Sequence, residues 1–105
     1  MKRVVVTGLG SITPIGNNLT EYWDGLLSGR NGIGSITLFD ASKHACRIAG
    51  EVKGFDPYEY LDRKEAKRMD RFTQFAVVAT KQAVTDAKFV INDLNAEQVG
   101  VLIGT

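Results

Sequence analysis

A cysteine and a histidine stand close together in the segment K-H-A-C-R-I, as a nucleophile and its base would. His44 and Cys46 are two residues apart, so in an extended chain their side chains share a face. The adjacent Arg47 would favour a thiolate. A nucleophilic cysteine needs a base positioned by the fold, however, and His44 is the only histidine of the chain. We interpret Cys46 as structural or incidental, and the sequence predicts no metal site because zinc needs three or four ligands.

A basic cluster occupies the segment D-R-K-E-A-K-R-M-D-R at residues 62–71. On a helix that turns ~100° per residue, the following cations fall within an arc of roughly 140°: Arg63, Lys64, Lys67 and Arg68. The acidic residues at 62 and 65 fall outside that arc. Such a face is either solvated or a docking patch for an acidic partner. Exposed charge contacts contribute only ~0.2–1 kcal/mol each, but together they steer association.

The loop T-G-L-G-S-I-T-P follows a β-branched run and resembles a dinucleotide-binding turn. That motif needs Gly or Ala at the position of Thr13, and Pro14 disfavours a helix there. The next helix is expected only from Leu19, too late for its amides to meet a phosphate held by the glycines. We interpret Gly8 and Gly10 as allowing tight passage of the chain beneath a packed neighbour.

Hydrophobic periodicity predicts two substantial helices. The first begins at Leu19, with Asn18 as N-cap, Glu21 at capping-box spacing and Gly29 at the left-handed C-terminal position. The second covers about 71–88 and should be largely buried, with a row of alanines that permits close approach of a neighbouring element.

The remaining elements are shorter. Residues 3–7 and 99–103 are apolar on both faces and are predicted to be interior strands of a parallel sheet. Residues 47–52 are a weaker strand candidate, and helical segments are expected to start at Asp56-Pro57 and at Asp62. The strands lack partners and cover here, so we expect 1–105 to be part of a larger α/β domain. The alternative is a compact domain with a short sheet.

Composition limits the function classes. The chain has 105 residues, 44% hydrophobic content and a formal charge of +1, which is typical of globular proteins and not of nucleic-acid binders. No apolar run approaches the ~18 residues of a membrane span, and the N-terminal run is too short for a signal peptide. A single cysteine suits a reducing compartment. We expect a cytoplasmic protein, or one of the plastid stroma in a plant or alga.

Several segments together resemble one enzyme family, and the resemblance covers the whole chain from the first strand. They are V-V-V-T-G-L-G-S-I-T-P-I-G-N (4–17), W-D-G-L-L-S-G-R-N-G-I (23–33), F-D (39–40), A-G-E-V-K-G-F-D (49–56), L-D-R-K-E-A-K-R-M-D-R-F-T-Q-F-A (61–76) and V-G-V-L-I-G-T (99–105). They look like the start of a β-ketoacyl-acyl carrier protein synthase II, an elongating condensing enzyme. The similarity is to bacterial and plastid members, with a cyanobacterial or plastid-like character.

The resemblance implies a thiolase-like, layered α/β/α/β/α fold, incomplete in this chain, and a homodimeric enzyme. Such enzymes elongate fatty acids by decarboxylative Claisen condensation of an acyl-enzyme with malonyl-acyl carrier protein. They need no cofactor beyond the carrier's phosphopantetheine. The family's catalytic cysteine, histidines and lysine would follow residue 105, so the resemblance implies no catalytic residue here and no activity of 1–105 alone. Cys46 and His44 do not match those motifs.

What the resemblance does carry over is the basic patch. Lys64, Lys67 and Arg68 match family positions that face the acidic recognition helix of acyl carrier protein. Two alternatives stay open: a non-catalytic module that binds an acidic carrier protein, and a polyketide-type ketosynthase relative.

Overall fold

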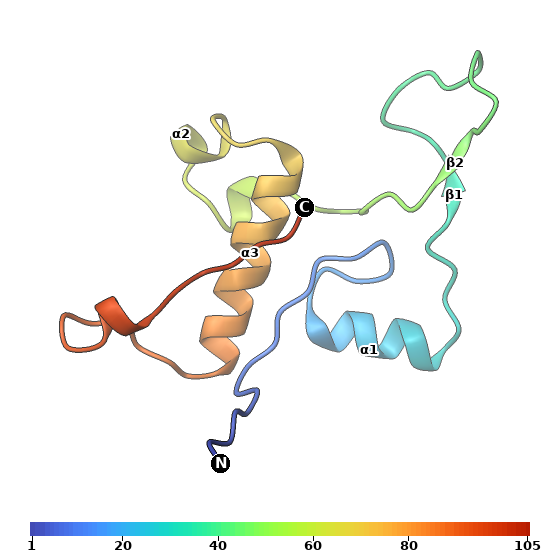
Figure 1. Cartoon of the computed structure of the whole chain (residues 1–105). Helices are drawn as coiled ribbons and strands as arrows, with labels where there is room; N and C mark the ends of the chain where they lie inside the picture. The colour runs from blue at the N-terminus through green and yellow to red at the C-terminus, as the bar shows by residue number, and fades with distance from the viewer.

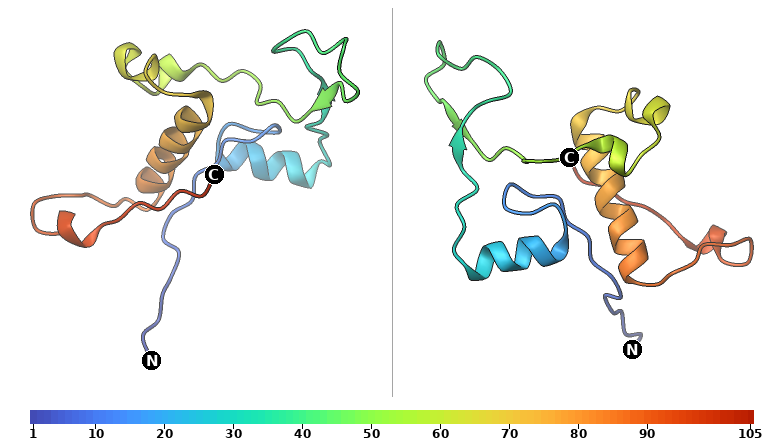
Figure 2. Two further views of the ribbon diagram at one scale, coloured as in Figure 1. Left: turned by 45° about the horizontal axis from the view of Figure 1, so that its top comes forward. Right: turned by 180° about the vertical axis from the view of Figure 1, so that it is seen from behind.

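The long helix α3 is the central element of the computed structural model, which describes all of residues 1–105 (Figure 1). The elements in chain order are α1 (Leu19–Leu27), β1 (Gly34–Ser35), β2 (Ile48–Ala49), η1 (Pro57–Glu59), α2 (Arg63–Ala66), α3 (Arg71–Asp86) and η2 (Ala96–Gln98). The C-terminus lies beside α3, the N-terminal segment extends away from the rest of the molecule, and the segment that contains β1 and β2 projects away from α3 (Figure 2). None of the helices has the length and hydrophobicity needed to span a bilayer.

Helix α1 begins and ends where the sequence predicts. The Asn18 side chain accepts a hydrogen bond from the Glu21 amide at 2.8 Å, which satisfies one of the free N–H groups of the first turn. The Glu21 carboxylate in turn accepts from the amide of Asn17 at 2.8 Å, one residue earlier than in a standard capping box. Gly29 adopts a φ of +66° directly after the C-cap, a conformation that only glycine takes without cost.

The opening loop crosses α3 at very short range. A Cβ on Gly10 would lie 2.8 Å from the Ala83 nitrogen and closer still to the Ala79 oxygen. A Cβ on Gly8 would lie 2.7 Å from the Cβ of Ala87. The glycines of the loop and the alanines of α3 therefore permit the same close contact. This confirms that the glycines allow tight passage of the chain and that the alanines permit close approach of a neighbouring element.

A two-stranded antiparallel ladder forms the base of a projecting arm. Gly34 pairs with Ala49 and Ser35 with Ile48. The weak strand expected over 47–52 is thus confirmed only at Ile48–Ala49. The loop between the strands, residues 36–47, is mostly exposed, and we call residues 34–49 the arm.

The two interior strands expected at the ends of the chain are absent as paired strands. Residues 3–7 and 100–105 take part in no backbone–backbone hydrogen bond, and Val4 and Leu102 are 96% and 97% exposed. A ladder needs a partner strand, and none of the residues described supplies one. The expectation of strands at 3–7 and 99–103 is therefore wrong for this structure.

The hydrophobic core is small because the two end segments form no sheet that could pack against α3. Helix α3, expected to be largely buried, has one fully buried residue, Val78. The radius of gyration is 16.8 Å, against about 13 Å for a compact domain of 100 residues. The two end segments are exposed, and most apolar residues of α3 are only half-buried.

Candidate functional site

The basic segment lies on a short helix that is anchored to α3. Helix α2 spans only Arg63–Ala66, and the Asp62 side chain caps it by accepting from the Lys64 amide at 3.0 Å. A single turn is not stable by itself. Leu61 and Ala66 are 6% and 1% exposed and pack with Val78 of α3 in the one core cluster. Packing against α3 therefore holds this turn in place.

Three cations of the segment point into solvent without a partner in the chain. Lys64 lies in α2, Lys67 is its C-cap, and Arg68 follows. All three residues are exposed, and none of their side chains donates a hydrogen bond. The sequence predicted that the four cations share one face of a single helix. This prediction is wrong in part, because α2 ends at Ala66 and the Arg68 amide bonds to the Glu65 carbonyl in a tighter turn. We call Lys64, Lys67 and Arg68 the free cations.

The two arginines that flank them are engaged inside the chain. The Arg63 guanidinium lies 4.9 Å from the ring centroid of Tyr58. Arg71 lies 4.9 Å from the ring of Phe75 and 5.9 Å from that of Phe55. Such cation–π contacts contribute about 0.5–1 kcal/mol at exposed sites. The sequence reasoning grouped Arg63 with the free cations and missed these aromatic partners.

Arg71 also links two segments by a hydrogen bond. Its guanidinium donates to the Val52 carbonyl at 3.2 Å, which ties the start of α3 to the chain that leaves the arm. The spacing of Arg71 and Phe75, four residues apart on one helix, is a signal that sequence reasoning could have used. The structure thus divides the basic residues into two that stabilise the fold and three that are available to a partner.

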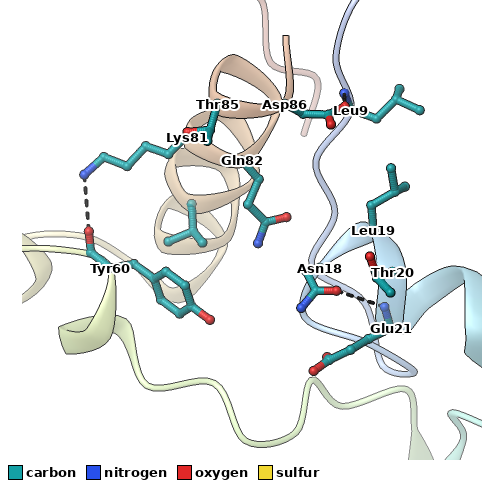
Figure 3. Close-up of a pocket in the computed structure, with 11 residues that line it drawn as sticks. Leu9, Asn18, Leu19, Thr20, Glu21, Tyr60, Lys81, Gln82, Thr85 and Asp86 are labelled. Atoms are coloured by element: carbon teal, nitrogen blue, oxygen red, sulfur yellow. Dashed lines mark hydrogen bonds between the residues drawn. The ribbon is translucent and has the colours of Figure 1, made fainter. Parts of the chain in front are cut away.

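A cleft of about 570 Å³ lies between the opening loop, α1 and α3 (Figure 3). Its polar side chains mostly bind the backbone of the chain. Asp86 accepts from the Leu9 amide at 2.9 Å, and Lys81 donates to the Tyr60 carbonyl at 3.3 Å. Gln82 accepts from Ser11 N at 3.0 Å and donates to Asn17 O at 2.7 Å. The residues of the cleft therefore position the opening loop on α3.

The cysteine and histidine do not form a catalytic pair. The Cys46 thiol contacts the Ile48 carbonyl at 3.4 Å, whereas the His44 ring packs edge-on against Phe39 at 5.6 Å between centroids. No group of three or more residues of the types that bind metals is clustered. Gly8 and Gly10 face α3, not the start of a helix that binds phosphate, so the dinucleotide interpretation is excluded.

Glu51 fastens the arm to the chain that follows it. Its carboxylate accepts hydrogen bonds from Thr37 N and Oγ1, both at 3.0 Å, and from Leu38 N at 3.1 Å. Desolvation acts to raise the pKa of this carboxyl, but the bonds from Thr37 and Leu38 and the nearby Lys53 ammonium outweigh it and hold the pKa below 4.5. Ionised Glu51 thus orders the arm.

Comparison with known proteins identifies the class. The family model described as the N-terminal domain of β-ketoacyl synthases matches residues 1–105, and the chain belongs to this family. It is 71% identical over 104 residues to 3-oxoacyl-[acyl-carrier-protein] synthase 2 of Synechocystis sp.. It is 49% identical over 104 residues to the protein of the same name from Staphylococcus aureus. In both cases the match covers 99% of this chain and 25% of the relative.

Solved structures show the same fold. The ishigamide ketosynthase/chain length factor matches 85% of this chain with a TM-score of 0.77 and 39% identity. A β-ketoacyl synthase from Burkholderia phymatum matches 92% with a TM-score of 0.72 and 31% identity. These matches span 22% and 24% of the neighbours' chains. The chain therefore has the architecture of the N-terminal part of a thiolase-like ketosynthase, and it spans about a quarter of the length of its relatives.

Proposed function

We propose that this chain is the N-terminal part of an elongating 3-oxoacyl-acyl carrier protein synthase. The observation that carries the proposal is the 71% identity over 104 residues to an enzyme of that name from a cyanobacterium. We also propose that the whole enzyme is a homodimer in the cytoplasm, or in the plastid stroma of a plant or alga. Residues 1–105 would be one part of its first ketosynthase domain.

The proposed reaction lengthens an acyl chain by two carbons. An acyl group on an enzyme cysteine is attacked by the carbanion that malonyl-carrier forms when it loses carbon dioxide. The new C–C bond forms as the acyl–sulfur bond breaks, which releases 3-oxoacyl-carrier and the free cysteine. The nucleophile and its histidines would lie outside residues 1–105, because Cys46 and His44 do not match them and contact other groups. The carrier's phosphopantetheine is the only prosthetic group required.

Within this chain the free cations would dock the carrier protein. Lys64, Lys67 and Arg68 are exposed and their side chains make no hydrogen bond within the chain, so an acidic helix can approach without breaking existing side-chain contacts. Attraction of this kind is screened over ~8–10 Å at physiological salt. The docking site therefore suits a partner that binds quickly and leaves quickly.

Product analysis tests the proposed activity. The full-length protein is incubated with acyl-carrier and malonyl-carrier, and mass spectrometry follows the carrier species. We expect a 3-oxoacyl-carrier two carbons longer than the acyl group supplied. A protein that binds the carrier and forms no such product would instead be a non-catalytic carrier-binding module.

Charge reversal tests the docking site. Lys64→Glu combined with Arg68→Glu should raise the KM for carrier-bound substrates at low salt, because two attractive charges become repulsive. The matched control is Lys43→Glu with Arg47→Glu, which makes the same change of charge at exposed positions of the arm. An unchanged KM for the α2 variant, or an equal rise in the control, would exclude a specific docking role.

A polyketide-type ketosynthase is the second candidate. It is favoured by the similarity to the ishigamide ketosynthase/chain length factor, at 39% identity and a TM-score of 0.77. The product assay separates the two. A fatty acid enzyme acts on saturated acyl-carriers, whereas a polyketide enzyme would prefer acyl groups that still bear keto or alkene groups.

A further inference from the structure

The C-terminal end of α2 is held by a side chain from α3. The last carbonyl groups of a helix have no partner within the helix. The Ala66 carbonyl accepts a hydrogen bond from Gln74 Nε2 at 3.0 Å, in a partly buried setting. It also accepts from the Met69 amide at 3.2 Å. Ala66 itself is 1% exposed, so little water can replace the Gln74 amide at this carbonyl.

The Ala66 carbonyl belongs to the same planar peptide unit as the nitrogen of Lys67. A bond that orients this carbonyl therefore also orients the backbone from which the Lys67 side chain leaves, and Arg68 follows directly. Backbone hydrogen bonds from the Lys67 amide to Arg63 O and from the Arg68 amide to Glu65 O also hold this turn, but a single turn of helix is marginal by itself. Gln74 is uncharged and lies on another helix, and its bond adds support to the backbone directly before two of the free cations.

We propose that Gln74 is a positioning residue for carrier-protein docking. Its amide holds the end of α2 so that Lys67 and Arg68 are presented in one fixed arrangement to the acidic partner. This inference rests on the proposed function, since it needs a carrier protein that docks on the free cations. Gln74 would act only through Ala66 and would touch neither substrate nor carrier.

Gln82 provides a matched control. It lies eight residues further along the same helix and likewise uses its amide to donate to a backbone carbonyl, that of Asn17 at 2.7 Å. Its partner is in the opening loop, not in α2. Gln74→Met and Gln82→Met each remove one such donor and keep a side chain of similar length, and Gln82→Met also removes the acceptor for the Ser11 amide. Gln82→Met should therefore cause at least as much structural damage as Gln74→Met, but without the effect on docking.

The test compares carrier-bound and carrier-free substrates in the full-length enzyme. Loss of one hydrogen bond predicts a rise of roughly three- to tenfold in the KM for acyl-carrier and malonyl-carrier in Gln74→Met. The kinetic constants for the corresponding coenzyme A thioesters, which lack the carrier protein, should not change. Gln82→Met should leave the ratio of the two KM values at its wild-type level. Gln74→Leu also removes the donor and adds no charge near the free cations, and should give the same selective rise if Gln74→Met folds poorly.

The outcomes separate this inference from the proposed function. If Gln74→Met and Gln74→Leu leave the KM for carrier substrates unchanged, or alter both substrate types equally, the positioning role is refuted. If charge reversal at Lys64 and Arg68 raises that KM while the Gln74 variants do not, only this inference fails. If charge reversal has no effect either, the docking site of the proposed function fails with it.

Discussion

The close crossing of the opening loop over α3 makes Gly10→Ala the most informative stability variant. The added Cβ would sit 2.8 Å from the Ala83 nitrogen and closer to the Ala79 oxygen. Both are backbone atoms of a helix and cannot turn aside as a flexible side chain would. Overpacking of this kind costs about 1–3 kcal/mol.

Moving the loop away would relieve the clash only by weakening its attachment. The hydrogen bonds from Leu9 N to Asp86 and from Ser11 N to Gln82 flank Gly10 on either side, and each contributes about 1 kcal/mol. We expect Gly10→Ala to lower the free energy of unfolding by roughly 2–4 kcal/mol.

Denaturant unfolding of the full-length protein, followed by circular dichroism, measures this effect. The control is Gly100→Ala, where an added Cβ has no atom within 4 Å and φ is not positive. It should leave stability within about 0.5 kcal/mol or raise it slightly. If Gly10→Ala is no more destabilising than Gly100→Ala, the loop does not pack on α3 as described.

Two further predictions concern the cap of α1 and the arm. Asn18→Ala removes the acceptor for the Glu21 amide and should cost about 1 kcal/mol of stability in thermal melts, whereas an unchanged Tm would contradict the capping role. The lowered pKa of Glu51 means that its stabilising contribution is complete above its ordinary value of 4.5 and disappears as pH falls through the lower folded-state pKa. Hydrogen exchange at the Thr37 and Leu38 amides should therefore show protection at neutral pH that is lost in acid, and Glu51→Gln should weaken that protection at neutral pH. Equal protection in wild type and variant would show that the carboxylate does not order the arm.

Local features were predictable from sequence because they depend on neighbouring residues. The Asn18 cap and the left-handed Gly29 are decided within one turn of α1. Gly8 and Gly10 and the alanines of α3 were each expected to permit a close approach, because only small residues do so, although their contact with one another was not predicted. In each case the residue type itself restricts the backbone.

Features that depend on distant partners were predictable only in part. The sequence indicated that the apolar segments 3–7 and 99–103 lack partners within 1–105, but not that they would form no strand, which requires a second chain segment in register. The distinction between free and engaged cations was also missed, because the aromatic ring beside Arg63 is brought there by the fold of η1. The roles of Lys64, Lys67 and Arg68 in docking remain predictions.

The most direct test of the central claim follows the carbon atoms of the condensation. The full-length protein receives an unlabelled acyl-carrier and malonyl-carrier with ¹³C in its malonyl group, and mass spectrometry records the products. The account predicts a 3-oxoacyl-carrier that contains two labelled carbons, with one labelled carbon dioxide released for each molecule formed. Release of carbon dioxide without chain extension, or no turnover of either carrier, would contradict the assignment as a condensing enzyme.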